Sequence, residues 1–393
     1  MLTSSLPNFS IAFVHNTDTY LYRHRKALLR ELVERGNVVF AVAPPGEYVG
    51  DLESLGVRFV PWNVNRRGLN PVAELRSLIN LRRILSDIRP DILHDMTVKP
   101  NIYGALAAWT LGLKPTISSV GGLGYPFTSH AIKARILRWL LFPLYRRAFK
   151  LSNMVTFENE WDRRYLAKPK STEGQRYVIG GTGIDLSIFR SEAYSTRMRA
   201  DLRRSLGMTD QNKIVLLVGR MLWDKGIGEY VASARLVTQH VPSARFLLVG
   251  PSDDNPTAIH PDQLARWNDE GVVQYLGERN DVPHLLSISD LVVLPTYWEG
   301  NPLTLMEAAC MGKPMVASDV PGCRMVVEHG VNGMLVPPRD ERLLANAIET
   351  VLESKDLQAR FGVAALEKAK REFDENVIAK RFLDLYERLL AKP

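Results

Sequence analysis

The sequence has few cysteines and no long apolar run. Cys310 and Cys323 are too few for a disulfide framework and lack the companion ligands of a zinc site. No apolar stretch approaches the roughly 20 residues that a helix needs to cross a bilayer. Residues 1–10 lack the basic start and the long apolar core of a secretory signal. We therefore expect a cytoplasmic protein.

Acidic residues are scarce in one part of the chain. Residues 101–150 contain seven lysines and arginines and no aspartate or glutamate. Residues 1–185 contain 25 basic and 15 acidic side chains, whereas residues 186–393 contain 25 and 28. This asymmetry predicts an anionic partner for the first half of the chain. No recognition motif accompanies the basic charge, and aromatic residues are not interleaved with it, so we expect no nucleic-acid partner.

Short apolar runs alternate with helical patterns in two series. The length of 393 residues suits two α/β domains, and this alternation predicts parallel sheets in Rossmann-like halves. A polar stretch at 187–212, with a helix expected at 194–206, is the candidate connection, and residues 375–390 read as an amphipathic helix. The strands are expected at 11–14, 38–42, 57–60, 92–94, 116–119, 154–157 and 177–179, then at 214–218, 245–249, 273–276, 291–294, 315–318 and 334–336; helices are expected at 25–35, 73–87, 229–240 and 340–352.

Two glutamates stand eight residues apart around a predicted helix start. Glu299 follows the expected strand at 291–294, and Glu307 lies on the helix that comes next. Asn301 suits the N-cap, Pro302 the first helical position and Gly312 the C-terminal stop. Ligands of open α/β sheets bind at the carboxyl ends of the strands, and a helix N-terminus there favours anions. Two acids beside an anion site indicate a ligand with both diphosphate and hydroxyl groups, such as a nucleotide sugar.

This segment resembles the E-x7-E signature of retaining glycosyltransferases of family 4, which have the GT-B fold. Ordered matches along the C-terminal half extend the resemblance: Val218-Gly219-Arg220, Lys225-Gly226, Gly277, Asp281, Leu294-Pro295, Gly330, Asn332-Gly333 and Leu335-Val336. The resemblance implies two Rossmann-like domains facing across a cleft. Residues 1–186 would form an acceptor-binding domain, with helix 375–393 packing back on it, and residues 187–374 would form the nucleotide-sugar domain.

The resemblance also implies roles for individual residues. Glu307 would bind the ribose hydroxyls, and Glu299 would contact the donor sugar. Arg220 and Lys225 follow a buried strand, so they are placed to stabilise the charge that develops on the departing diphosphate. Backbone amides would bind the sugar or its diphosphate at Gly300, Asn301, Pro302 and Leu303. The family does not generally need a metal, so we expect no metal or other cofactor, and we interpret the Asp253-Asp254 pair as a solvated loop.

The N-terminal half resembles a bacterial subgroup that extends polyprenyl-diphosphate-linked sugars, including N-acetylgalactosaminyltransferases that act on undecaprenyl-diphosphate-linked bacillosamine. The segments that match are Asp91-Ile-Leu-His94, Lys99-Pro-Asn101, Tyr103-Gly104, Leu106-Ala-Ala108 and Gly122-Leu-Gly124. The family's usual glycine loop after the first strand is replaced by residues 15–20. His15, His94, Lys99 and Gly122 are therefore the candidate contacts of this domain, with scaffold roles equally open for the three side chains. Arg25 is expected to be an exposed charge near a helix end.

Residues 131–150 combine apolar and basic side chains. Trp139 and Phe142 stand among Lys133, Arg135, Arg138, Arg146 and Arg147. That pattern is typical of a segment lying on an anionic membrane surface, and the alternative is a buried core helix with a basic solvent face. Pro143 is expected to kink or break a helix here.

Together these features predict a retaining, metal-independent glycosyltransferase, peripheral at the inner face of the cytoplasmic membrane. It would transfer a hexose or N-acetylhexosamine, N-acetylgalactosamine as first choice, from a UDP-sugar to a polyprenyl-diphosphate-linked glycan. Two alternatives remain: a nucleotide-sugar 2-epimerase of the same fold, and an inactive homologue that binds sugar nucleotides. An NAD-dependent enzyme is disfavoured because Gly121-Gly-Leu-Gly124 lacks the full dinucleotide fingerprint.

Overall fold

The chain folds into two compact α/β units. A computed structural model describes residues 8–65, 68, 70–122, 127, 132–166, 176–253 and 257–391. One unit comprises residues 1–183 together with 375–393, and the other comprises Ile184–Asp374. The boundary after Gly183 precedes the polar stretch at 187–212, which belongs to the second unit and contains α8 (Thr196–Ser205).

The first unit is built on a parallel sheet. Its seven strands among the described residues have the order β3-β2-β1-β4-β5-β6-β7. The central strands are buried along their whole length because helices cover both faces. The strands are β1 (Ser10–Val14), β2 (Val38–Ala43), β3 (Arg58–Pro61), β4 (Ile92–Met96), β5 (Thr116–Val120), β6 (Met154–Phe157) and β7 (Arg176–Val178).

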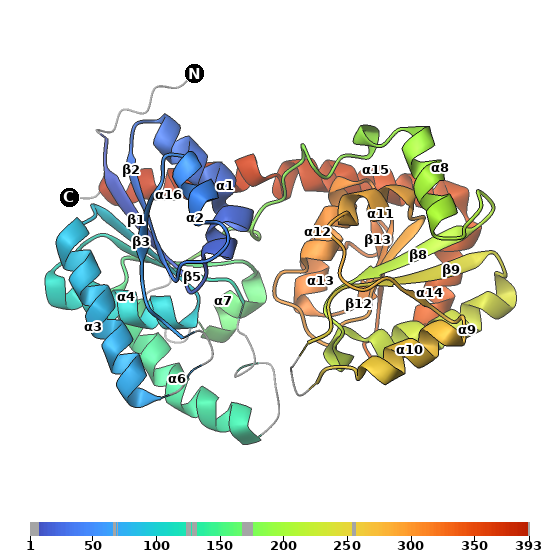
Figure 1. Cartoon of the computed structure of the whole chain (residues 1–393), viewed down its shortest axis with the longest axis horizontal. Helices are drawn as coiled ribbons and strands as arrows, with labels where there is room; N and C mark the ends of the chain where they lie inside the picture. Colours follow the sequence, from blue (N-terminus) through green and yellow to red (C-terminus); the bar gives the residue numbers. More distant parts are fainter. Residues whose placement is uncertain are drawn as a thin grey trace. The chain divides into compact units, whose positions relative to one another are not determined.

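Two layers of helices enclose this sheet (Figure 1). Apolar side chains of α1, α2 and α16 form one core with the strands, and those of α3 and α4 form a second core with them. The last helix, α16, packs along α1, so the end of the chain completes the core of its beginning. The helices are α1 (Asp18–Glu34), α2 (Val49–Ser54), α3 (Pro71–Ile88), α4 (Val98–Leu111), α6 (Ile132–Leu151), α7 (Glu160–Leu166) and α16 (Glu375–Leu390).

Two of these helices differ from expectation. α1 begins seven residues before the predicted start at position 25, because the Thr17 side chain caps it by accepting from the Tyr20 amide. α6 continues through Pro143 without a break. The carbonyl that Pro143 leaves without an amide partner is that of Trp139, whose side chain is 76% exposed, so water can take that place. Within the described ranges, none of the helices combines the length and hydropathy that crossing a bilayer requires.

The second unit repeats the architecture. Its parallel sheet has the order β10-β9-β8-β11-β12-β13 over the described residues. Helices α11, α12, α13 and α15 contribute to the core on one face, and α9, α10 and α14 to the core on the other (Figure 1). The elements are β8 (Lys213–Val218), α9 (Ile227–His240), β9 (Ala244–Val249), α10 (Pro261–Asp269), β10 (Gln274–Tyr275), α11 (Val282–Ile288), β11 (Leu291–Leu294), α12 (Leu303–Cys310), β12 (Met315–Ser318), α13 (Pro321–Val326), β13 (Gly333–Val336), α14 (Glu341–Glu353) and α15 (Lys355–Glu372).

Candidate active site

The predicted donor residues gather at the carboxyl edge of the second sheet. Glu299 lies in the loop between β11 and α12, and Glu307 lies on α12. The helix begins at Leu303 with Pro302 as its N-cap, so Asn301 is not the cap that the sequence predicted. The carbonyl of Pro302 accepts the first helical hydrogen bond, from Met306, at 3.1 Å. Gly312 ends the helix at φ +64°, a conformation that favours glycine.

Lys225 and Glu299 form an ion pair in this region. Their side chains are only 20% and 17% exposed. Lys225 ends a short 3-10 helix after β8 (Trp223–Lys225), and the Asp224 carbonyl there accepts from the amide of Tyr297 at 2.9 Å. This bond joins the loop after β8 to the loop after β11. The backbone bond brings the two loops together, and the ion pair orients the two side chains.

Glycine makes this approach of the two loops possible. Gly226 has φ +72°, and a Cβ added there would lie 1.9 Å from the carbonyl oxygen of Pro295. At Gly322, in α13, an added Cβ would lie 2.2 Å from the Glu299 carbonyl oxygen, which accepts from the Gly322 amide at 3.1 Å. Any larger residue would push the loops apart.

Arg220 is paired with an aspartate from the loop after β9. Its guanidinium donates to Asp253 at 2.8 Å; the arginine side chain is 52% exposed and the aspartate side chain 11% exposed. The expectation of a solvated Asp253 is therefore wrong, because its side chain is nearly buried and bonded to Arg220. Asp254 lies outside the described residues. Within the described part of the chain, no group of three or more His, Cys, Asp or Glu residues is placed to hold a metal ion.

Burial perturbs Glu307. Its carboxyl has a pKa raised from 4.5 to about 7, because desolvation disfavours the charged form.

Thr304, in the first turn of α12, donates its hydroxyl to the carbonyl of Val218 at 3.0 Å and so ties this helix to the end of β8. The sequence reasoning did not single out Thr304 and Gly322, and it interpreted Asp253 as solvated. Only Pro321, which precedes Gly322 at a helix start, gave a readable signal.

The candidate contacts of the first unit are distributed differently. His94 is 0% exposed, and its ring nitrogens bond the hydroxyls of Tyr386 at 2.7 Å and Ser119 at 2.6 Å. Burial lowers the pKa of His94 well below its usual value, so the ring is neutral. Lys99 donates at 2.7 Å to each of three acceptors: Glu74 and the carbonyls of Asn65 and Gly68. These contacts favour the scaffold alternative for both residues, since His94 is buried and Lys99 donates all three of its protons.

His15, Gly122 and Arg25 have different surroundings in this unit. The ring of His15 is buried and stacks on Tyr20 with centroids 4.3 Å apart. Gly122 has φ +111° with open space where a Cβ would be. Arg25 is 4% exposed, not the exposed charge expected, because α1 starts earlier and turns this residue inward toward Phe382.

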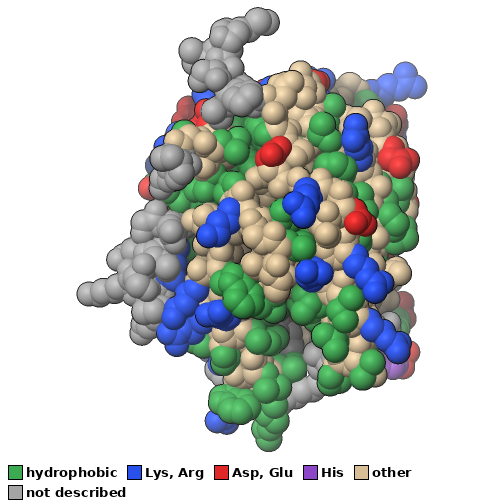
Figure 2. Space-filling view, turned by 90° about the vertical axis from the view of Figure 1, so that its left-hand side faces the viewer, with side chains coloured by type: hydrophobic (Ala, Val, Ile, Leu, Met, Phe, Trp, Pro, Cys, Tyr) green, Lys and Arg blue, Asp and Glu red, His purple; other side chains and the backbone are tan. Residues whose placement is uncertain are grey.

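Helix α6 presents apolar side chains to solvent. Ala134, Tyr145 and Phe149 pack inward, while a stripe on the opposite side is exposed by 46–76%: Ile132, Ile136, Trp139, Leu140 and Leu144. Arg135 and Arg146 are exposed on the same helix, whereas residue 131 lies outside the described ranges. Figure 2 shows this side of the first unit, with hydrophobic side chains gathered at the bottom, the height of α6 in Figure 1. The buried-core interpretation of α6 therefore does not account for its outer face.

Both halves of this sequence match known protein families. Residues 198–368 match the model of group 1 glycosyl transferases, and residues 10–159 match that of glycosyl transferase 4-like domains. The chain is 30% identical over 380 residues to the N,N'-diacetylbacillosaminyl-diphospho-undecaprenol alpha-1,3-N-acetylgalactosaminyltransferase of Campylobacter jejuni, covering 97% of this chain and 99% of the relative. It is 26% identical over 318 residues to the UDP-Gal:alpha-D-GlcNAc-diphosphoundecaprenol alpha-1,3-galactosyltransferase of Escherichia coli, covering 80% and 79%.

Solved structures share the fold. Anabaena HepE, crystallised in complex with UDP and glucose, aligns with a TM-score of 0.77 at 21% identity, covering 97% of this chain and 100% of that one. A glycosyltransferase from Rickettsia africae aligns with a TM-score of 0.79 at 18% identity, covering 99% and 100%. Two parallel Rossmann-like units, the gathered Glu299–Glu307 segment and similarity along nearly the whole chain agree: the protein belongs to the family 4 glycosyltransferases of GT-B fold.

Proposed function

We propose that this glycosyltransferase transfers an N-acetylhexosamine or hexose from a UDP-sugar to a polyprenyl-diphosphate-linked glycan, with retention of configuration and without a metal. N-acetylgalactosamine is the first choice of sugar, since the relative from Campylobacter jejuni is named for that transfer and matches 97% of the chain. The relative from Escherichia coli is also named for a UDP-sugar and an undecaprenyl-diphosphate acceptor.

One observation supports the donor site above all others. Two ion pairs, Arg220 with Asp253 and Lys225 with Glu299, follow strands of one sheet at its carboxyl edge, where ligands of open α/β sheets bind, and Glu307 lies on the helix that follows Glu299. Lys225 is held by Glu299 within a largely buried pair, so its charge is oriented before a donor arrives. Cations oriented in advance stabilise the charge that develops on a departing diphosphate more than they stabilise the ground state.

The roles then divide among the four side chains. Arg220 and Lys225 hold the diphosphate, Glu299 positions the sugar, and Glu307 accepts hydrogen bonds from the ribose. The backbone amides of Gly300, Asn301 and Leu303, at and just before the start of α12, add donors near the phosphate, whereas Pro302 has no N–H to donate. The acids act mainly by orientation, and the rate enhancement comes from positioning together with stabilisation of the leaving group.

A binding experiment tests the donor site without an acceptor. UDP-, GDP- and ADP-sugars are screened by thermal shift in the presence of EDTA, with wild type and Glu299→Gln. We expect one UDP-sugar to stabilise wild type and the variant to lose most of that shift. Stabilisation by no nucleotide sugar would refute the donor site, and stabilisation only after a divalent cation is restored would refute metal independence. The anomeric configuration of the product, read by NMR, tests retention.

The acceptor proposed here is anchored in a membrane, and α6 supplies a surface suited to it. Its exposed stripe and its arginines combine apolar area with positive charge, which favours an interface of anionic lipids. We therefore place the enzyme as a peripheral protein at the inner face of the cytoplasmic membrane.

Vesicle sedimentation tests this placement. Ile136→Ser combined with Trp139→Ser should release the enzyme from vesicles containing anionic phospholipid, because both side chains lie on the exposed stripe. Val363→Ser, on α15 and 61% exposed, is the matched control and should leave binding unchanged. Equal binding of the double variant and wild type would rule out α6 as the membrane contact.

A further inference from the structure

Tyr297 lies in the loop after β11, two residues before Glu299, and three other segments of the second unit contact it. Its amide is bonded to the short 3-10 helix that ends at Lys225. Its hydroxyl donates to Glu229, in α9, at 2.6 Å. The guanidinium of Arg339, from the loop between β13 and α14, lies over its ring with Cζ 4.3 Å from the centroid. One aromatic side chain therefore joins the loop of Glu299 to two further elements.

Glu229 holds the phenol from the first turn of α9. One of its carboxylate oxygens accepts from Tyr297, and the other is buried without a hydrogen-bond partner among the described atoms. A hydrogen bond from a hydroxyl to a carboxylate is short and roughly twice as strong as one between neutral groups. Burial, together with the bond to Glu229, raises the pKa of Tyr297 above its usual value, so the phenol keeps its proton and remains the donor.

Arg339 covers the ring from a strained backbone position. Its φ of +65° lies in the left-handed region, which residues other than glycine seldom occupy. Pro338 precedes it, and Asp340 follows as the N-cap of α14, where the Asp340 carboxylate accepts from the amides of residues 342 and 343. Such strain persists where the surrounding structure holds a residue in place, and it is concentrated at functional sites. Among the described side chains, no carboxylate forms an ion pair with Arg339, and its charge faces the aromatic ring instead.

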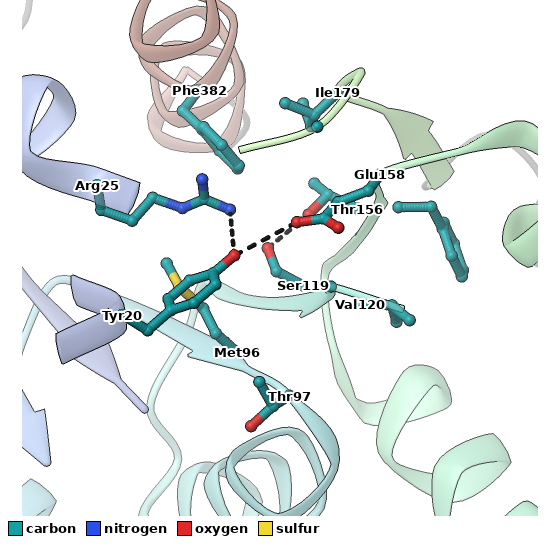
Figure 3. A pocket seen from close by; sticks show the side chains of 13 residues that line it. Tyr20, Arg25, Met96, Thr97, Ser119, Val120, Thr156, Glu158, Ile179 and Phe382 are labelled. Carbon is teal, nitrogen blue, oxygen red and sulfur yellow. Dashed lines mark hydrogen bonds between the residues drawn. The ribbon is translucent and has the colours of Figure 1, made fainter. Parts of the chain in front are cut away.

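The first unit contains a similar arrangement, shown in Figure 3. The hydroxyl of Tyr20, in α1, donates to Glu158 after β6 at 3.3 Å and accepts from Arg25 at 3.1 Å. There, a tyrosine between two opposite charges ties a helix to the end of a strand. Tyr297 forms the same kind of tie in the second unit, but its loop also carries a residue of the donor site.

Glu299 depends on this loop for its position. Its carboxylate pairs with Lys225, whose own loop is bonded to the amide of Tyr297. That backbone bond does not involve the Tyr297 side chain, so the two loops stay tied whatever side chain residue 297 carries. Arg220 and Glu307 belong to other segments, after β8 and on α12. A displacement of about 1 Å at a reacting group can lower a rate about 10²-fold, so a small shift of this loop would affect the sugar contact first.

Resting on the proposed function, we infer that Tyr297 is a positioning residue that sets the place of Glu299 toward the donor sugar. Glu229 holds its phenol, and Arg339 covers its ring. The contacts to the diphosphate and to the ribose do not depend on it. The sugar, rather than the nucleotide, is therefore the part of the donor whose binding Tyr297 controls.

Calorimetry with two ligands tests this role. Dissociation constants of the full-length enzyme are measured for UDP and for the UDP-sugar that gives the largest thermal shift of wild type. The ratio of the UDP constant to the UDP-sugar constant reports the contribution of the sugar. We expect Tyr297→Phe to lower this ratio about fivefold, as the loss of one hydrogen bond, with the UDP constant unchanged. The transfer rate at saturating donor should fall about tenfold, because Glu299 is then displaced.

Substitutions at the two partners separate the hydrogen bond from the bulk of the side chain. Glu229→Gln keeps an acceptor oxygen and should retain most of the wild-type ratio, whereas Glu229→Leu removes it and should match Tyr297→Phe. Arg339→Met should lower the ratio only about twofold, since a cation–π contact of an exposed arginine is weak. A ratio that falls equally in Glu229→Gln and Glu229→Leu would overturn the role of the bond between phenol and carboxylate.

Tyr230→Phe is the matched control for a loss of stability. This next residue of α9 is buried, and its hydroxyl donates to the carbonyls of Val215 in β8 and Leu247 in β9 at 2.9 Å each. The variant should lower the unfolding midpoint and leave the ratio unchanged. An equal loss of ratio in Tyr230→Phe, an unchanged ratio in Tyr297→Phe, or equal weakening of both ligands would overturn the inference. Binding of no UDP-sugar by wild type would refute the proposed donor function instead.

Discussion

The substitution Glu307→Gln tests whether an ionised carboxylate at the proposed ribose site destabilises the second unit. Burial raises the pKa of the Glu307 carboxyl from 4.5 to about 7. At about 1.36 kcal/mol per pKa unit, keeping this group ionised in the folded state destabilises the protein by roughly 3 kcal/mol. Glutamine has the same shape and no charge. We therefore expect the variant to be more stable than wild type by up to about 3 kcal/mol at pH 8.

The stability gained by Glu307→Gln depends on pH. The pKa values of Glu307 in the unfolded and folded states set the direction of this dependence. Below 4.5 both the folded and unfolded states hold the proton, and the gain disappears. Between 4.5 and about 7 only the folded state holds it, so the unfolded state binds fewer protons and wild type loses stability as the pH rises. Above about 7 both states are ionised and the gain is constant. At pH 5 the expected gain is about 1 kcal/mol.

Scanning calorimetry at pH 5 and pH 8 measures this difference. The transition of the second unit, Ile184–Asp374, is identified by its shift with UDP. For a domain of this size, 1 kcal/mol corresponds to roughly 2–4 °C in midpoint, so several degrees are expected at pH 8. Glu353→Gln, exposed on α14, is the control and should leave the midpoint unchanged. A variant no more stable than wild type at pH 8, or equally stabilised at both pH values, would refute the reasoning.

The same variant should bind UDP more weakly. Loss of a charged acceptor for the ribose hydroxyls weakens binding about tenfold at pH 8. In wild type, binding of UDP should tighten between pH 6 and pH 8, because the carboxyl loses its proton across this interval. Isothermal titration at the two pH values tests both statements, and unchanged UDP affinity in Glu307→Gln would remove this residue from the ribose site.

Three further substitutions test the loops around the donor site. Lys225→Met should lower the rate of UDP release in the transfer assay by about 10²–10³-fold, because it removes a cation that is oriented toward the leaving group. Circular dichroism should show that this variant is still folded. Gly226→Ala should destabilise the protein by at least about 2 kcal/mol in urea unfolding and abolish the UDP thermal shift, since its Cβ would lie 1.9 Å from the carbonyl of Pro295. Asp253→Asn should tighten UDP binding about threefold at low salt and less at high salt, because the carboxylate that competes with the diphosphate for the exposed Arg220 is lost. Weaker binding would instead make Asp253 the group that orients this arginine.

The sequence predicted the central strands of the sheets well because these strands are buried on both faces. Runs such as 154–157, 291–294 and 315–318 coincide with the observed strands β6, β11 and β12. Continuous apolar runs bounded by turn residues are readable without tertiary information. The placement of Glu299 in a loop and of Glu307 on a helix followed from the same signals.

Contacts between residues that are far apart in the sequence could not be predicted from these local patterns. Arg25 was expected to be exposed because the predicted helix began at this residue; Phe382, which packs against it, comes from the other end of the chain. Lys99 donates to three acceptors that lie 25–34 residues away in the sequence, which the sequence alone does not indicate. Pro143 was expected to kink or break α6, yet the helix continues through it; Trp139, whose carbonyl loses its amide partner, is on the exposed side of the helix.

The position of α16 has a consequence for how the protein is made. Phe382 and Tyr386 complete the core that β1, β2 and α1 begin, yet they are synthesised after the whole of Ile184–Asp374. At about 5–20 residues per second, the ribosome needs roughly 10–40 s to reach α16 after finishing β7. During that time the apolar surface that α16 will cover stays open to chaperones, while the second unit can already close its own core. We therefore expect a nascent chain arrested before α16 to show a protease-resistant second unit and a protease-sensitive first one.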